Sequence, residues 1–265
     1  MPLAVEHIRR MRGGAQSHLM RCEDGDYYVV KFQNNPQHRK ILANELLGTL
    51  LARRLGLPAA PVDVVDVRPE LIEKTAELVM QIGAAREPCA TGRQFGSRYP
   101  GNPAQLAVLD FLPDEQLGEV ENLDAFAGMF AFDKWTCNTN GRQTVFFREG
   151  ESSRYQAWMI DQGFCFNAQN WDFPDAPLRG LYARACVYDH VRGMEAFEPW
   201  LARIERAGRD GALDEVASRI PPEWYDGELD ALYGLLERLV RRTPRLPDLI
   251  LDARNSYRRP FRNWT

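Results

Sequence analysis

The chain has 265 residues, 45% hydrophobic and 26% charged, which is typical of a globular protein large enough for two lobes. The formal net charge of -4 gives no reason to expect a direct nucleic-acid partner. We expect a cytoplasmic protein with no membrane partner, zinc site or disulfide framework, because membrane-length apolar runs, a signal-peptide core, CxxC pairs and HExxH pairs are all lacking.

The N-terminal third predicts an antiparallel sheet with one main helix. Asp24-Gly25 signals a two-residue hairpin, because both central positions of a type I′ turn need positive φ. Apolar residues then recur at helical spacing up to Leu55. The predicted elements are strands at residues 6–11, 18–23, 26–32 and 62–67, a helix between Pro36 and Gly56, and an apolar run from Leu78 to Ile82.

A first group of residues suggests phosphate binding. Gly13 to Gln16 form a glycine turn between two strands, and such a turn lets backbone N–H groups approach phosphates. Lys31 ends an apolar strand and needs a partner if it points inward, and Glu45 follows in the helix. A lysine–glutamate pair of this kind orients ATP phosphates in protein kinases. The alternative is an ordinary hairpin with a surface lysine, but order and spacing together favour ATP binding.

The chain changes character after Gly83. Residues 83–104 are rich in glycine and proline, so we predict a long irregular connection. We therefore expect an N-terminal lobe at residues 1–83 and a mainly helical lobe at residues 84–265. The predicted elements of the second lobe are helices at 123–134, 193–207, 211–219 and 227–241, strands at 144–148 and 157–160, and a basic tail from Arg254.

A second group of residues lies in this C-terminal part. The polar loop 138–143 follows a helix, and Asp161 ends a strand next to Gly163. In phosphoryl-transfer sites such a loop orients or deprotonates the acceptor hydroxyl, and a strand-end Asp holds Mg²⁺. The alternative is that Asp161 only forms a turn and that Asn138 and Asn140 only cap a loop.

Together these motifs resemble the HipA-like serine/threonine kinases, the toxin half of some bacterial toxin–antitoxin pairs. The resemblance covers most of residues 7–167 and implies a bilobal, protein-kinase-like α+β fold, here expected as a minimal kinase core. The matching segments are Gly14-Ala15-Gln16 for the glycine loop, Val30-Lys31 for the strand lysine, Asn44-Glu45 for the helix glutamate, residues 132–141 for the catalytic loop and Asp161-Gln162-Gly163 for the metal-binding strand end.

Three positions depart from the family pattern. Asn140 stands where the family has its catalytic Asp, with Arg142 where it has His. Val145 stands where the family has a metal-binding Asn. Asparagine cannot take a proton from the acceptor hydroxyl, and a positioned general base is worth roughly 10²–10⁴-fold in rate. The sequence therefore predicts impaired phosphoryl transfer without predicting a loss of ATP binding.

These observations give one main hypothesis and two alternatives. The main hypothesis is an ATP- and Mg²⁺-dependent kinase that phosphorylates a serine or threonine of a protein acceptor; the family suggests a translation-related acceptor and an antitoxin-type partner. The first alternative is a pseudokinase that binds ATP or a partner without transferring phosphate, which the residues at 140 and 145 favour. The second keeps the fold but phosphorylates a small molecule or a lipid head group. We expect catalytic roles for Asn140 and Lys31, nucleotide contacts from Gly13, Gly14, Ala15, Gln16, Lys31 and Glu45, adenine at a hinge near Gln81 and Ile82, and metal ligands in Asp161 and Gln143.

Overall fold

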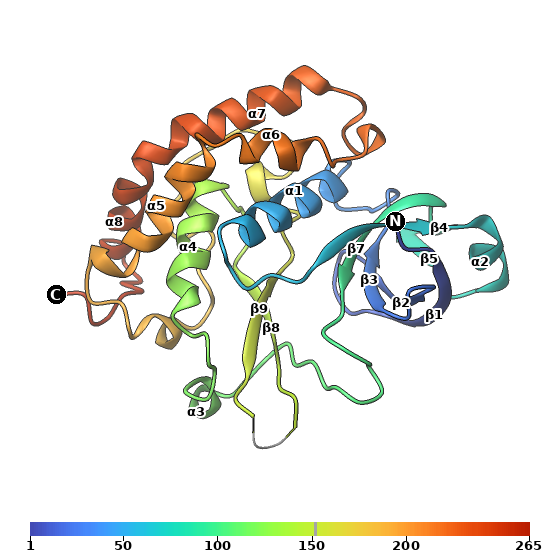
Figure 1. Cartoon of the computed structure of the whole chain (residues 1–265), viewed down its shortest axis with the longest axis horizontal. Coiled ribbons are helices and arrows are strands. Elements are labelled where there is room, and N and C mark those ends of the chain that lie inside the picture. The colour runs from blue at the N-terminus through green and yellow to red at the C-terminus, as the bar shows by residue number, and fades with distance from the viewer. Residues whose placement is uncertain (151–152) are drawn as a thin grey trace.

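The structure, a computed structural model, describes residues 1–150 and 153–265. Figure 1 shows strands gathered in the N-terminal part and helices in the C-terminal part. This arrangement confirms the predicted α+β fold class. No helix in the described part of the chain is both long and apolar enough to cross a membrane.

The N-terminal part is built on a five-stranded antiparallel sheet. Its strand order is β1-β2-β3-β7-β4, so a late strand lies between β3 and β4. Strand β3 shows why these residues form strands: it consists of two aromatic residues, two β-branched residues and Lys31, and burial alternates from Tyr27 to the fully buried Val30. The strands are β1 (Ala4–Arg10), β2 (His18–Cys22), β3 (Tyr27–Lys31), β4 (Val62–Val67) and β7 (Gly92–Arg98).

The region predicted as an irregular connection contains two of the strands. Residues 85–88 form β6 (Ala85–Pro88), which pairs with β5 (Val79–Ile82), and residues 92–98 form β7. Gly96 belongs inside β7, because a Cβ at this position would lie 2.4 Å from Val65 Cγ2. The irregular-connection prediction is therefore wrong. The boundary expected after residue 83 divides the sheet itself, whose strands run on to Arg98.

The turn between β2 and β3 also differs from the prediction. Gly25 has φ 84°, and its N–H donates to the Cys22 carbonyl at 3.0 Å. Asp24 does not have positive φ, so the type I′ prediction is wrong. The loop is instead a three-residue turn that ends on a left-handed glycine.

Both faces of the sheet are covered. On one face lies α1 (Ile41–Arg54), buried from Ile41 to Ala52, which begins five residues later than Pro36 suggested. On the other face, α2 (Pro69–Lys74) and the β5–β6 hairpin enclose a second core that includes Phe32, Val65 and Met80. The sheet is thus held between the helical part of the molecule and an outer cover formed by residues 69–88 (Figure 1).

The C-terminal part surrounds a fully buried helix, α4 (Ala125–Trp135). A helix that is buried on every side indicates a central position, which α4 has (Figure 1). The final helix, α8 (Leu246–Arg254), was not predicted from the sequence, although its apolar residues Leu246, Leu249, Ile250 and Ala253 are buried at helical spacing. The remaining elements are α3 (Asp114–Leu117), β8 (Gln143–Phe147), β9 (Gln156–Ile160), α5 (Glu198–Ala207), α6 (Ala212–Ala217), α7 (Leu229–Arg242), α8 (Leu246–Arg254) and the 3₁₀ helices η1 (Cys165–Asn167), η2 (Ala185–Tyr188), η3 (Met194–Ala196), η4 (Pro222–Tyr225) and η5 (Thr243–Arg245).

Candidate active site

Lys31 joins three segments that are far apart in the sequence. Its ammonium group donates to Glu45 Oε1 and, at 2.8 Å, to Asp161 Oδ1. Lys31 ends β3, Glu45 lies on α1, and Asp161 directly follows β9. The structure therefore brings together three charged residues that the sequence order singled out, at the place where the sheet meets the helical part.

Burial makes this cluster strongly interacting. The side chains of Lys31, Glu45 and Asp161 are only 11%, 2% and 16% exposed. Burial acts to lower the pKa of Lys31, but the two carboxylates outweigh burial and raise it. One lysine faces two carboxylates, so the cluster carries a formal charge of about -1 and attracts a cation.

Glu45 is fixed from the opposite side by the backbone that follows Asp161. Its Oε2 accepts from Gln162 N–H at 3.0 Å, and its Oε1 accepts from Gly163 N–H at 2.9 Å. A Cβ on Gly163 would lie 3.0 Å from Glu45 Oε1 and 2.7 Å from Ile41 Cγ1. A side chain at position 163 would therefore separate the helix from this turn.

Asp161 is the residue best suited to hold a metal ion. It has φ 62°, a left-handed conformation, and its Oδ2 accepts from Gln143 Nε2 at 2.7 Å. Burial acts to raise the pKa of Asp161, but attraction to Lys31, the hydrogen bond from Lys31 and the charge of Arg142 together outweigh burial and lower the pKa to about 2. A carboxylate beside an amide offers the oxygen donors that Mg²⁺ prefers, so Asp161 and Gln143 fit one ion once the amide turns its oxygen inward.

The loop of Asn140 is held by its own polar groups. Asn138 Oδ1 accepts from Asn140 N–H at 3.0 Å, and Asn140 Oδ1 accepts from Gly141 N–H at 2.9 Å. The carbonyl of Asn140 accepts from Gly180 N–H at 3.1 Å. The half-buried Asn140 side chain therefore lies in an ordered loop, but an amide there supplies a hydrogen-bonding group and no base.

Beneath this loop lies a buried ion pair whose partner on α4 the sequence did not reveal. Asp133 on α4 accepts from Arg142 through both oxygens, with Arg142 Nε at 2.8 Å from Oδ2. The two side chains are 0% and 1% exposed. Arg142 Nη1 also donates to the carbonyl of Ile160, the residue before Asp161, at 2.7 Å. Arg142 thus links the Asn140 loop to the turn at Asp161.

The residues of the expected nucleotide contacts are only partly together. Gly13 to Gln16 form the turn between β1 and β2, and Asn35 Nδ2 donates to the Ala15 carbonyl at 2.9 Å. Gln16 Nε2 donates to the Gln81 carbonyl at 2.8 Å, and Gln81 N–H donates back to Gln16 Oε1 at 2.7 Å. Gln81 and Ile82 lie on β5, in the outer cover, whereas the chain leaves the sheet through β7.

Asn44 has a larger role than a motif match suggested. Its amide donates to the carbonyls of Gly163, Cys165 and Ala168 at 2.9, 3.0 and 2.8 Å. Its oxygen accepts from Trp171 Nε1 at 2.8 Å. An Asn in the mostly apolar helical segment Ile41–Ala52 was the available signal, because a buried Asn needs partners for all its polar atoms.

Residues 4–235 match the sequence profile of the HipA-like kinase family. No protein of curated function matches the sequence significantly. The Helicobacter pylori proinflammatory kinase CtkA is similar in structure, with a TM-score of 0.56 and 14% identity over 91% of this chain and 94% of that one. The Golgi casein kinase with Mn/ADP bound has a TM-score of 0.52 and 12% identity over 97% of this chain and 74% of that one. Hydra Fam20 with sugar has a TM-score of 0.53 and 14% identity over 96% of this chain and 86% of that one. The kinase-like fold is thereby confirmed, and the family match supports a kinase-like function.

Proposed function

Because the chain belongs to the HipA-like kinase family, we propose that it binds ATP with Mg²⁺ and transfers the γ-phosphate to a serine or threonine of a protein acceptor. The observation that carries this proposal is the buried contact of Lys31 with both Glu45 and Asp161. Protein kinases need a phosphate-binding lysine, the glutamate that pairs with it and a metal-binding aspartate close together in the active site.

The phosphates belong beside Lys31, under the glycine turn. Gly13 has φ 112°, and no heavy atom lies within 4 Å of a Cβ built on it. Backbone N–H groups of such a turn can approach phosphate oxygens closely. On nucleotide binding, Lys31 keeps Glu45 and turns its remaining donors from Asp161 towards phosphate. Asp161 and Gln143 would then hold Mg²⁺, which neutralises charge on the phosphates.

We place the adenine at the end of β7 and not at Gln81. Lys31 pairs with Phe95 and Val29 pairs with Ser97 across β3 and β7, so these four side chains share one face of the sheet. Val62 of β4 pairs with Ser97 on the same face. The base would rest on this mostly apolar surface, next to the chain that leaves the sheet after Arg98.

Because of Asn140 we expect phosphoryl transfer to be slow. Its loop is ordered, so the acceptor hydroxyl can still be positioned, but the amide cannot accept the hydroxyl proton. Phosphoryl transfer depends mainly on positioning and charge neutralisation, so we expect slow transfer, about 10²–10⁴-fold below an enzyme with a base. A translation-related acceptor and an antitoxin-type partner stay predictions from the family resemblance.

A pseudokinase is the second candidate function. It is favoured by Asn140 and by Val145, a strand residue of 8% exposure with no polar group for a second metal ion. In this case the Lys31 cluster would still bind ATP, and the bound state would serve as a signal to a partner. The two candidates share the nucleotide site and differ only in the transfer step.

One set of measurements tests both candidates. ATP binding with Mg²⁺ is measured by calorimetry for the unmodified chain, for Lys31→Met and for the matched control Lys74→Met, an exposed lysine on α2. We expect binding by the chain and the control, and none by Lys31→Met. Labelled ATP and a library of serine- and threonine-containing peptides then report transfer, with Asn140→Asp as the variant that regains a base.

The outcomes separate the two functions. Transfer by the unmodified chain, lost in Lys31→Met, supports the kinase. Transfer by Asn140→Asp alone supports the pseudokinase. Equal ATP binding by Lys31→Met and the control would refute the nucleotide site itself.

A further inference from the structure

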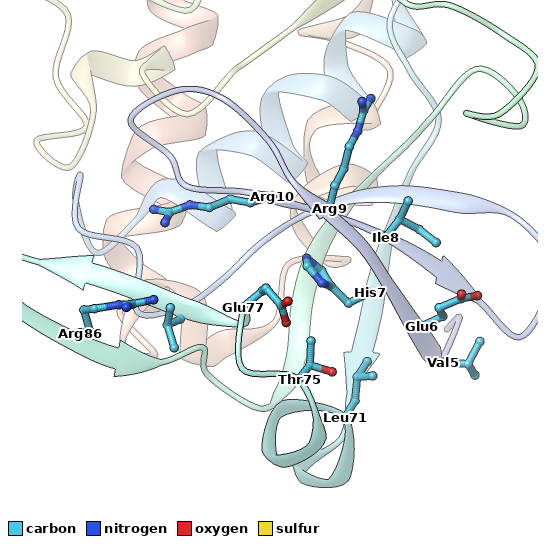
Figure 2. A pocket seen from close by; sticks show the side chains of 11 residues that line it. Val5, Glu6, His7, Ile8, Arg9, Arg10, Leu71, Thr75, Glu77 and Arg86 are labelled. Carbon is cyan, nitrogen blue, oxygen red and sulfur yellow. The ribbon is translucent and has the colours of Figure 1, made fainter.

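A cavity lies on the outer side of the sheet, away from the Lys31 cluster. It measures about 610 Å³ and opens to solvent between β1 on one side and α2, β5 and β6 on the other (Figure 2). This volume is in the range of small-molecule sites. The lining residues are Val5, Glu6, His7, Ile8, Arg9, Arg10, Leu71, Thr75, Glu77, Val79 and Arg86.

Two arginines on opposite walls give the cavity an anion-binding end. Figure 2 shows Arg10 of β1 and Arg86 of β6 at the same end of the gap, with Glu77 and His7 between the two walls. In the described part of the chain, neither guanidinium has a carboxylate within 4.0 Å. Two like charges that face one gap repel each other, and an anion between them removes that repulsion.

The rest of the cavity is not suited to more negative charge. Glu77 contributes a carboxylate, Thr75 a hydroxyl, and Leu71 and Val79 apolar surface. Burial lowers the pKa of His7, so its ring is mainly neutral near pH 7 and serves as a hydrogen-bonding group. A ligand with one anionic end and a neutral, hydroxyl-bearing remainder therefore fits these walls.

We propose that this cavity binds a small phosphorylated molecule, with its phosphate between Arg10 and Arg86 and its hydroxyl groups towards Glu77 and Thr75. A phosphate offers several oxygens in a tetrahedral arrangement, so guanidinium groups from two different strands can each bind a separate edge. Sugar phosphates and nucleoside monophosphates have this chemistry.

The cavity is connected to the glycine turn by side-chain contacts. Arg10 donates to Gln16 Oε1, and Gln16 is bonded in both directions to the backbone of Gln81 on β5. An anion that draws Arg10 towards Arg86 competes with the contact between Arg10 and Gln16. A ligand in the cavity would therefore change the position of the turn and the affinity for ATP. This coupling rests on the proposed function, whereas binding in the cavity does not.

Binding is tested with ribose 5-phosphate as the probe, by calorimetry on the full chain without ATP. The variants are Arg86→Gln, the nucleotide-site variant Lys31→Met, and Arg238→Gln, a matched change of an exposed arginine on α7. We expect the unmodified chain, Lys31→Met and Arg238→Gln to bind alike, and Arg86→Gln to bind about tenfold more weakly or worse. Ribose without phosphate should not bind.

Four results would overturn the proposal. These are no binding by the unmodified chain at about 10 mM probe, unchanged binding by Arg86→Gln, loss of binding in Lys31→Met, and binding of ribose as tight as that of ribose 5-phosphate. The coupling is tested separately with Gln16→Ala. In the unmodified chain the probe should change ATP affinity about fivefold. In Gln16→Ala this effect should vanish while the probe still binds, and an unchanged effect would refute the connection through Gln16.

Discussion

Replacing Arg142 by methionine is expected to destabilise the fold severely, because it leaves a charge buried without a partner. The Asp133 carboxylate is 0% exposed and would keep only the hydrogen bond from Asn138 Nδ2 at 3.0 Å. Breaking a buried ion pair from one side costs about 3–5 kcal/mol. The Ile160 carbonyl also loses its donor. In a chain of this size, such a loss lowers Tm by about 6–20 °C.

Thermal unfolding followed by circular dichroism measures this effect. The matched control is Arg241→Met, which removes an ion pair with Glu237 whose side chains are 71% and 70% exposed. That change should cost less than about 1 kcal/mol. The double change Asp133→Asn with Arg142→Met removes both charges and should recover part of the loss. A single variant that loses under about 1 kcal/mol, or a double variant no better than the single, would refute the reasoning.

Two further predictions concern buried polar groups. Gln162 is 0% exposed, and neither of its amide atoms has a hydrogen-bond partner among the residues that the structure describes. Gln162→Leu should therefore raise the free energy of unfolding by about 1–3 kcal/mol in urea titrations; a decrease would show that the amide is satisfied in solution. Burial, with His7 and Arg10, lowers the pKa of His18 to about 4. In the unfolded chain His18 has its ordinary pKa of 6.5, so as the pH falls the unfolded chain is protonated at a higher pH than the folded one. The free energy of unfolding should therefore fall between about pH 6.5 and pH 4. His18→Phe should flatten this fall in urea midpoints, and an unchanged slope would contradict the assignment.

The sequence was most informative where local patterns carry chemical meaning. Lys31 ends a strand with strong β propensity, and Asp161 directly follows another strand, so both positions could be read without knowing the fold. Glu45 lies on a helix whose apolar spacing is plain from the sequence. The three residues meet because the fold brings β3, α1 and the end of β9 together. That they meet was predicted from the order of the motifs, which is the order in the kinase family.

Long-range pairing was the part that local patterns could not show. Gly92 and Gly96 are poor strand residues by propensity, yet β7 pairs with β4 over residues 92–97 and with β3 over residues 95–98. The glycine at 96 is required by contact with Val65 on a neighbouring strand, and no local rule reveals that contact. Because the sequence did not predict β7, we expected the hinge near Gln81, whereas the proposed adenine site lies beside β7, the strand through which the chain leaves the sheet.

The buried pair of Asp133 and Arg142 illustrates a second limit. Asp133 lies on a helix whose residues are all buried, where a single carboxylate gives no periodic signal. Arg142 stood out only as a departure from the family pattern, and its partner nine residues earlier is visible only in the structure. A charged residue in a buried helix, such as Asp133, therefore indicates a buried partner before it indicates a catalytic role.

The last prediction concerns which residue joins Asp161 at the metal. Gln143 and Val145 lie on the same face of β8, because side chains alternate along a strand. Gln143 pairs with Ile160, the residue before Asp161, whereas Val145 pairs with Trp158. Position 145 is thus about 7 Å further along the strand from Asp161. Gln143→Leu should therefore weaken Mg²⁺-dependent ATP binding about tenfold and leave Mg²⁺-free binding unchanged, whereas Val145→Asn should not strengthen either.

Calorimetric titration of ATP with and without Mg²⁺ distinguishes these effects, and Gln105→Leu, an exposed glutamine far from β8 in the sequence, is the control. If Val145→Asn tightened Mg²⁺-dependent binding and Gln143→Leu did not weaken it, the ligand would belong at the family's usual position. The short distance between Gln143 Nε2 and Asp161 Oδ2, 2.7 Å, would then be a contact of the metal-free turn alone. If the expected pattern holds, the amide has moved two residues along β8 relative to the family pattern, because position 143 is the one that reaches Asp161 across the strand pair.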